Sequence, residues 1–448
     1  MQKFIEAVDR NRTLALDALD YLWKNPETGY KEWKAQAYLT KAFRELGYEL
    51  VEAGNIPGFY CDLDTGRPGP MVVVMGELDA LICETHPNAD PETGAVHSCG
   101  HCCQAAGLLG LAAALKEPGV MDGWSGKIRL MATPAEELIE VEYREQLRKK
   151  GIIKYFGGKV EFMYRGFFEG ADLAFMIHRS SCGSHTGGVS KGSNGCIAKT
   201  VTFHGKASHA GAGPHLGINA LYAANQALSA ANALRETFRD EDHIRFHPII
   251  TGGGTVVNAI PDVVTMEAYV RGATMDAIVA ANKKINRAMA ASAAAIGAKV
   301  TIMDRPGYSP RLHDEGMMLV TKEAMECVLE KVNYNPTGWG TGCSDLGDVS
   351  MVFPAVHPYV GGTIGPGHSN SYFVDDPETA ALDLAKVELI MLELLLKDDA
   401  KRALEIKANF VPTFPSVEAF FAFIDQLDMD KEAVIYNEDG TVTLDYQK

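Results

Sequence analysis

MVVVMGELDA, residues 71–80, joins a continuous apolar run to two acidic side chains, Glu77 and Asp79. An apolar run without alternation is typical of a strand that is buried on both faces of a parallel sheet. Three similar runs follow between helical stretches, at KIRLMA (127–132), AFMI (174–177) and PAVHPYV (354–360). This alternation predicts an α/β domain with a mostly parallel sheet.

A second pattern occupies residues 195–306. Strand-like and Ala-rich helical segments follow one another there in the order βαββαβ, which is that of a ferredoxin-like unit. A Gly- and Ser-rich stretch at residues 183–195 precedes it and indicates a crossing between domains. We therefore predict a discontinuous domain formed by residues 1–194 and 307–448, with residues 195–306 as an inserted domain.

The composition limits the classes of function. The 448 residues are 46% hydrophobic and 22% charged, an ordinary globular composition that can bury a sizeable core. The formal net charge of −16 disfavours binding to nucleic acid or to an anionic membrane. We find neither a signal-peptide pattern nor a membrane-spanning run, and the nine cysteines are an odd number, so we expect a reducing, cytoplasmic location.

Potential metal ligands follow the ends of the predicted strands. Open parallel sheets place their sites just beyond the carboxyl ends of strands, so these residues should meet there. Thiolate, imidazole and carboxylate are the groups that bind zinc and related ions. Such a set exceeds the needs of one four-coordinate ion, whereas two ions with a bridging ligand would use it and could hold a water. The candidates are Cys99, His101, His178, His368 and one of the paired acids Glu136 and Glu137.

The paired acids Glu136 and Glu137 have distinct uses in such a site. Adjacent residues of an extended chain cannot both face one metal in the same way. One carboxylate can bind metal while its neighbour takes a proton from a bound water. A protein that only binds metal would not need this second acid, which disfavours a non-catalytic carrier of the same fold.

The cysteines allow another interpretation. Cys99 and Cys102 form a C-x-x-C pattern, which also occurs in thiol redox proteins. That chemistry needs a thiolate whose pKa is lowered at a helix N-terminus in a small βαβ fold. Redox chemistry would leave the other candidate ligands unexplained, so we disfavour it.

Several motifs occur in the order of a known family. HSCGH, ATPAEE, GKASHA, a GGG segment followed by Asn258 and Arg271, and GPGHS together resemble the aminoacylase, hippurate hydrolase and indole-acetyl-amino-acid hydrolase family of dimetal metallopeptidases. GELDAL, HGKASHAGAGPHLGINAL and SDLGDVS are most similar to its aminobenzoyl-glutamate hydrolase branch. The resemblance implies a zinc-peptidase-like catalytic domain, and it implies that the inserted domain serves as a lid and dimerisation domain.

The resemblance also implies roles in the catalytic domain. Glu136 would be the general base and would then protonate the leaving amine, and Asp79 would orient a metal-binding histidine. The cofactors would be two divalent transition-metal ions per chain, Zn²⁺ or Mn²⁺. Their ligands would be Cys99, which bridges the ions, and His101, Glu137, His178 and His368.

Three residues of the inserted domain receive roles from the same resemblance. His209 would reach the active site of a partner subunit and stabilise the oxyanion. Asn258 and Arg271 would hold the carboxylate of the substrate, a task that suits the planar guanidinium of arginine. We therefore expect a homodimeric amidohydrolase that acts on N-acyl or N-aroyl amino acids or on small dipeptides.

Two departures from the family pattern lie beside the expected site. Cys102 stands where the family usually has Asp or Asn, and Cys103 adds a further thiol. A charged segment, LIEVEYREQLRKKGIIKYFGG at residues 138–158, replaces a Gly-rich loop. Both leave the expected metal ligands in place, and both bear on the choice of substrate and metal.

Overall fold

The computed structural model describes residues 1–447, which divide into two compact units. Unit 1 comprises residues 1–192, 312–339 and 344–415. Unit 2 comprises residues 193–311, 340–343 and the chain from residue 416 onward. Within the described residues, no helix is both long enough and apolar enough to cross a membrane.

Unit 1 is built on a six-stranded sheet with the order β1-β2-β6-β3-β7-β16. Neighbouring strands run parallel from β6 to β16, whereas β1 and β2 are antiparallel additions at one edge. The MVVVM run forms the central strand, as predicted, because both of its faces are covered. The strands are β1 (Val51–Glu52), β2 (Phe59–Asp64), β3 (Met71–Glu77), β6 (Lys127–Thr133), β7 (Leu173–Phe175) and β16 (Ala355–Val356).

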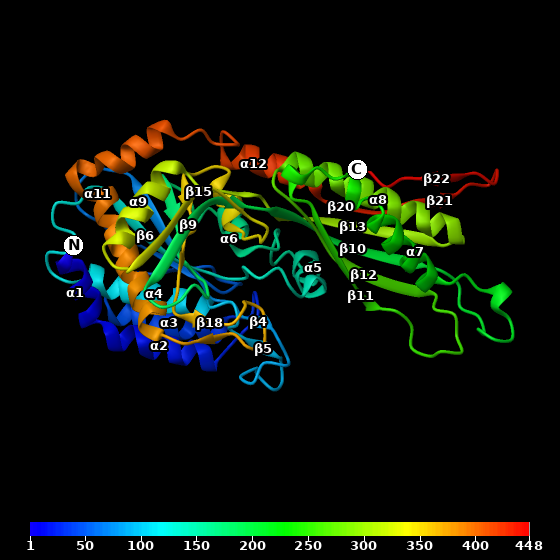
Figure 1. Ribbon diagram of the computed structural model, residues 1–448, viewed down its shortest axis with the longest axis horizontal. Helices are drawn as coiled ribbons and strands as arrows, with labels where there is room; N and C mark the ends of the chain where they lie inside the picture. The colour runs from blue at the N-terminus through cyan, green and yellow to red at the C-terminus, as the bar shows by residue number, and fades with distance from the viewer. Residues whose placement is uncertain (448) are drawn as a thin grey trace. The chain divides into compact units, whose positions relative to one another are not determined.

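The burial of helix α4 (His101–Leu115) explains why its residues are mostly small and apolar. All of its residues are buried, and it packs against β3, α2 (Arg12–Lys24) and α11 (Leu384–Asn409) (Figure 1). A Cβ on Gly107 would lie 2.4 Å from Leu384 Cδ2, so these helices approach too closely for a larger side chain. The other helices of unit 1 are α1 (Gln2–Arg10), α3 (Trp33–Glu45), α5 (Val141–Lys149), α6 (Gly158–Tyr164), α9 (Glu315–Glu326), α10 (Leu346–Ser350) and the π-helix η4 (Glu378–Asp383).

The predicted strand at 354–360 is divided between two sheets. Its first part is β16 in the main sheet, and its last part is β17 (Tyr359–Val360) in a smaller sheet. There β17 pairs with β8 (His178–Arg179) and with β9 (Thr186–Ser193). Pro358 lies between the two parts and has no N–H to donate, which favours an interruption of the ladder.

Unit 2 has the predicted βαββαβ order. Its strands form an antiparallel sheet with the order β11-β12-β10-β13-β20, and both helices pack on the sheet (Figure 1). Alternate residues such as Val201 and Phe203 are fully buried, so one face of the sheet packs against the Ala-rich helices. The elements are β10 (Gly195–His204), α7 (Ala220–Asn232), β11 (Arg245–Gly252), β12 (Val263–Gly272), α8 (Met275–Ile296) and β13 (Lys299–Tyr308).

The C-terminal segment belongs with unit 2, although the sequence analysis assigned residues 307–448 to the discontinuous domain. After α12 (Val417–Ile424), strand β20 (Met429–Glu432) pairs with β13 and extends the sheet. The main sheet of the unit therefore has five strands rather than the four of a plain βαββαβ order. This pairing depends on register between distant segments, which residue patterns do not report.

Candidate metal centre and active site

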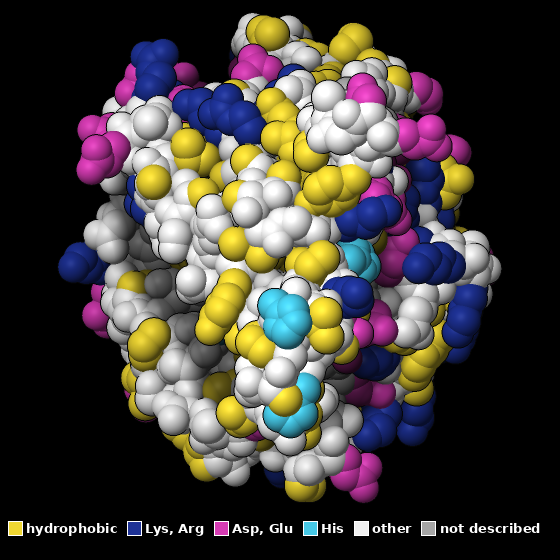
Figure 2. Space-filling view, turned by 90° about the vertical axis from the view of Figure 1, so that its right-hand side faces the viewer, with side chains coloured by type: hydrophobic (Ala, Val, Ile, Leu, Met, Phe, Trp, Pro, Cys, Tyr) yellow, Lys and Arg dark blue, Asp and Glu magenta, His cyan; other side chains and the backbone are white. Residues whose placement is uncertain are grey.

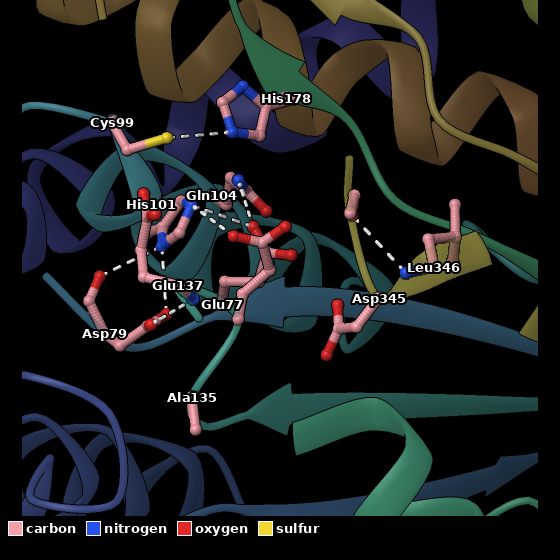
Figure 3. Close-up of polar contacts among 12 residues, drawn as sticks. Glu77, Asp79, Cys99, His101, Gln104, Ala135, Glu137, His178, Asp345 and Leu346 are labelled. Carbon is pink, nitrogen blue, oxygen red and sulfur yellow. Dashed lines mark hydrogen bonds and ion pairs between the residues drawn. The ribbon is translucent and has the colours of Figure 1, made fainter. Parts of the chain in front are cut away.

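The carboxyl ends of the central parallel strands bring the candidate residues of unit 1 together. Glu77 at the end of β3 lies opposite Thr133 at the end of β6. Glu136 and Glu137 follow Thr133 directly, and His178 begins three residues after the end of β7. Figure 3 shows the side chains of Glu77, Glu137 and His178 converging with those of Cys99 and His101, the latter from the first turn of α4.

Three overlapping groups of side chains could each hold a metal ion. Within each group, one ligand atom per residue lies within 4.8 Å of the others. Cys99 and His101 each belong to two of the groups. A residue shared by two groups is suited to a centre with two neighbouring ions. The groups are Cys99, His101 and His178; Cys99, Glu137 and His368; and Glu77, His101 and Glu136.

The environment of His101 fits a metal ligand. Its Nδ1 lies 3.0 Å from both the carbonyl oxygen and Oδ1 of Asp79. Both of those atoms only accept, so Nδ1 carries a proton, and in the neutral ring Nε2 has a free lone pair. Nε2 is buried 3.2 Å from Glu77 Oε2, and it has no hydrogen-bond partner among residues 1–447. A metal ion would satisfy this atom, which otherwise is a costly orphan.

Asp79 also fixes the segment that carries the two glutamates. Its Oδ2 accepts a hydrogen bond of 2.7 Å from the backbone N–H of Glu137. The carboxylate therefore orients His101 with one oxygen and Glu137 with the other. This geometry agrees with the orienting role expected of Asp79.

Glu136 and Glu137 differ in their electrostatic surroundings. Burial, together with the neighbouring charges of Glu77 and Glu137, raises the pKa of Glu136 well above its usual value. Burial also opposes ionisation of Glu137, but His368, whose Nε2 lies 3.2 Å from Glu137 Oε1, lowers its pKa to about 2. One carboxyl group thus tends to take up a proton while the other remains anionic, as a base and a ligand require.

His178 precedes the inserted residues 195–306 in the sequence and His368 follows them, yet both reach the same site. His178 Nδ1 donates to the carbonyl of Arg179 at 2.8 Å, so its Nε2, 3.5 Å from Cys99 Sγ, has the lone pair. Burial lowers the pKa of His178 to about 4, which keeps the ring neutral. His368 has a positive φ of 63°, and its backbone N–H donates to Ser98 O at 2.9 Å. That contact anchors the GPGHS loop beside the HSCGH motif.

The second thiol of the C-x-x-C pattern has a different environment. Cys102 is completely buried in α4, and so is Cys103. Cys99, in contrast, is only partly buried and faces the ring of His178. These environments favour Cys99 as a ligand and Cys102 as a packed core residue.

Unit 2 places His209 and Asn258 on adjoining segments. A bridge joins His209 to Ala259, and the N–H of Ala210 donates to the carbonyl of Asn258. His209 Nδ1 accepts hydrogen bonds from the N–H groups of Gly211 and Ala212, at 3.1 and 3.0 Å. The proton of the neutral ring is therefore on Nε2, where it can be donated to an oxyanion.

Arg271 lies near the end of β12, as the sequence predicted. It is paired in register with Cys196 of β10 and with Arg245 of β11. Its guanidinium carbon lies 5.6 Å from the centre of the Tyr269 ring. The ring supports one face of this planar cation.

The charged segment at 138–158 supports the turn that carries the two glutamates. Arg144 of α5 is almost fully buried, and it donates to the carbonyl of Phe156 at 2.6 Å and to that of Glu137. Glu32, also buried, accepts from the N–H of Ala135 at 2.7 Å. No role for these residues was predicted from the sequence, because a charge in an amphipathic helix usually faces solvent.

Lys159 follows the same segment and reaches the site directly. Its Nζ lies 2.5 Å from Glu77 Oε1 and 2.5 Å from Asp345 Oδ1. The preceding Gly158 has a special place, because a Cβ there would lie 1.6 Å from the carbonyl oxygen of Pro134. Only glycine allows α6 to begin so close to the ATPAEE motif.

Comparisons with known proteins agree with this architecture. Residues 191–296 match the peptidase dimerisation domain family. The Xaa-Arg dipeptidase of Mus musculus is 29% identical over 377 residues, covering 78% of this chain and 77% of the relative. The N-acetyl-L-cysteine deacetylase of Bacillus subtilis is 28% identical over 333 residues, covering 71% and 74%.

Two solved structures share the fold. The YXEP protein of Bacillus subtilis, described as a dinuclear metal-binding peptidase from the M20 family, superimposes with a TM-score of 0.63 at 19% identity, covering 87% of this chain and 99% of that one. The aminobenzoyl-glutamate utilization protein of Klebsiella pneumoniae gives a TM-score of 0.65 at 18% identity, covering 87% and 97%. The α/β fold with an inserted dimerisation domain is thereby confirmed.

Proposed function

Because this chain belongs to the M20 peptidase family, whose members are metal-dependent hydrolases of amide and peptide bonds, we propose a specific substrate class and mechanism for it. The substrates are N-acyl or N-aroyl amino acids, such as aminobenzoyl-glutamate-like amides, or small dipeptides. The observation that carries the proposal is the set of three overlapping ligand groups, which are linked because Cys99 belongs to two of them and His101 to two of them. Two Zn²⁺ or Mn²⁺ ions would be held by Cys99, His101, Glu137, His178 and His368.

The residues of unit 1 divide the work of hydrolysis. When bound, the two ions would polarise the amide carbonyl and lower the pKa of the attacking water. Glu136 would take a proton from this water as it attacks the carbonyl carbon, and would then deliver that proton to the departing nitrogen. The raised pKa of Glu136 supports this double role, since the same group must first accept and then donate.

The residues of unit 2 recognise the rest of the substrate. His209 donates Nε2–H to the oxyanion in a partner subunit's site, which the contacts at its Nδ1 support. Asn258 and Arg271 hold a carboxylate next to the scissile nitrogen. The names of two relatives, Xaa-Arg dipeptidase and N-acetyl-L-cysteine deacetylase, describe the hydrolysis of amides of this type.

A homodimer formed through unit 2 is part of the same proposal. Strand β11 lies at the edge of its sheet and exposes Ile249 and Ile250, and α7 exposes Tyr222. Figure 2 shows apolar side chains spread over the face of the molecule that it presents, with histidine side chains among them. An edge strand with exposed apolar side chains is suited to pairing with a second copy.

Metal analysis combined with a substrate panel tests the proposal. The purified protein should contain about two transition ions per chain, as a two-metal hydrolytic site requires. A chelator should abolish hydrolysis of N-acyl amino acids, and added Zn²⁺ or Mn²⁺ should restore it. Full activity in a metal-free preparation would contradict the mechanism, whereas activity confined to other amides would contradict only the substrate class.

A further inference from the structure

Three sequence features that the proposed mechanism leaves unused meet in one buried cluster. GELDAL provides Glu77, the residue after the charged segment is Lys159, and SDLGDVS provides Asp345. The side chains of Glu77, Lys159 and Asp345 are all fully buried. Residues from three distant parts of the chain, one of them next to the segment that departs from the family pattern, thus meet beside His101.

Lys159 is held at both ends by Asp345. The backbone N–H of Lys159 donates to Asp345 Oδ2 at 2.9 Å, and Nζ lies 2.5 Å from Oδ1 of the same carboxylate. The remaining contact of Nζ is with Glu77 Oε1, at 2.5 Å. The lysine is therefore a fixed bridge between the two carboxylates.

Glu77 has its second oxygen directed at the metal ligands. Gln104 Nε2 donates to Glu77 Oε2 at 2.8 Å, and the same oxygen lies 3.2 Å from His101 Nε2 (Figure 3). Glu136 Oε2 lies 3.8 Å from that nitrogen. Glu77, His101 and Glu136 thus form one of the three ligand groups. Within this group, Glu77 is held in position by the contact of its other oxygen, Oε1, with Lys159.

The charge balance of the cluster depends on His101. Glu77 and Asp345 together carry two negative charges against the one positive charge of Lys159. Burial opposes a charge on His101, but Glu77, Cys99 and Asp79 raise its pKa well above the usual value. A divalent ion at the lone pair of the neutral ring would replace the proton that His101 otherwise holds against Glu77, and the buried cluster would stay compensated.

We propose that Lys159 is a positioning residue of the metal centre, which together with Asp345 holds Glu77 so that Glu77 Oε2 joins His101 in binding one of the two ions. The proposal rests on the proposed function, because the ion concerned belongs to the same centre. The region of the charged segment then has a second role beside the support of Glu137. Lys159, the residue that follows the segment, places a positive charge at Glu77 Oε1, the oxygen of Glu77 that does not face His101.

Metal titration of the metal-free protein tests the proposal, with a chromophoric chelator as competitor and Zn²⁺ as the probe. The variants are Lys159→Met, Glu77→Gln and the double variant Lys159→Met with Asp345→Asn, which removes both charges of the pair. Lys150→Met is the control, because Lys150 is an exposed lysine of the same segment. Thermal unfolding of each metal-free protein is measured in parallel.

We expect Lys159→Met and Glu77→Gln to weaken the binding of one ion by about 10–100-fold and to leave the other ion and the control unchanged. The double variant should regain thermal stability relative to Lys159→Met but should keep the weakened ion. Recovery of both stability and affinity in the double variant would show that Lys159 only fills the core. Wild-type affinity in Glu77→Gln would equally overturn the proposal. If the unmodified protein bound no ions, the proposed function itself would fail.

Discussion

Two fully buried lysines, one in each unit, have opposite surroundings. Lys199 of β10 contacts Asp304, and it also lies 2.5 Å from Asn286 Oδ1. Asp304 Oδ2 in turn accepts hydrogen bonds from Asn282 at 2.7 Å and from Asn286 at 2.9 Å. The cluster in unit 2 therefore contains one cation, one anion and neutral amides.

Lys159 in unit 1 is placed between two carboxylates instead of one. Burial opposes its charge, but Asp345 and Glu77 outweigh burial and raise the pKa of Lys159. For Lys199, burial is the larger influence, and it lowers the pKa despite Asp304. The cluster in unit 2 balances its charges by itself, whereas the carboxylates around Lys159 need a second positive charge, which a protonated His101 or a metal ion beside Glu77 can supply.

The largest effect is expected at the proposed general base of unit 1. Glu136→Gln removes the carboxyl group that takes the proton and should lower turnover by about 10²–10⁴-fold, because the attacking water loses its base. The variant should fold and retain its metal, as measured by thermal unfolding and elemental analysis. Near-normal turnover would mean that another group is the base.

Lys199→Met should have the reverse outcome, a large loss of stability with little effect on the metal centre. Removal of one partner leaves Asp304 buried without a cation, which costs about 3–5 kcal/mol in the free energy of unfolding. Denaturant titration measures this loss, and the metal content of the folded protein should stay unchanged. Lys283→Met, at an exposed position of α8, is the control. If both variants were equally stable, the balanced cluster would not contribute to folding.

Arg271 tests whether a cation of unit 2 can serve binding rather than balance. Arg271→Ala should erase the preference for substrates with a free carboxylate, a loss of about 2–5 kcal/mol in transition-state stabilisation. Competition between an N-acyl amino acid and its amide measures the preference as a ratio of kcat/KM values. Equal values for the two substrates in the unmodified enzyme would remove the carboxylate contact from the mechanism.

The smallest signal is expected from mixed dimers. His209→Ala and Glu136→Gln chains should each be inactive alone, since one lacks the donor to the oxyanion and the other lacks the base. After subunit exchange, half of the dimers are mixed and each has one complete site, so roughly a quarter of the sites should work. Activity measured before and after exchange decides this. A strictly monomeric active enzyme would contradict the contribution of His209 from a partner.

The elements of the fold were predictable where burial determines composition. MVVVM and KIRLMA became β3 and β6 because residues buried on both faces of a sheet must be apolar. Pro358 offered a signal that the 354–360 run is interrupted, but the sheets that its two parts join, and the addition of β20 to the inserted unit, were not predictable. These pairings depend on which distant strand offers free backbone groups, and the residue pattern of a segment does not contain that information.

The site residues divide in the same way: those recognisable by their chemical type could be predicted, and those whose role depends on a distant partner could not. The candidate metal ligands could be identified because thiol, imidazole and carboxylate groups follow strand ends. Lys159 and Arg144 could not be identified, since a cation in a charged segment usually lies at the surface. Their burial depends on carboxylates and carbonyls that are distant in sequence or belong to a turn whose conformation the sequence does not reveal.

The close approach of Gly158 to Pro134 has a consequence for engineering. The segment between Glu137 and Gly158 can be regarded as an exchangeable segment whose C-terminal end is fixed by the close approach of Gly158 to Pro134. A shorter or longer loop can be grafted upstream, but any graft has to re-enter at a glycine and present a lysine next to it. Libraries aimed at new amide substrates should therefore vary the exposed residues of 138–156 and leave Arg144 and residues 157–159 untouched.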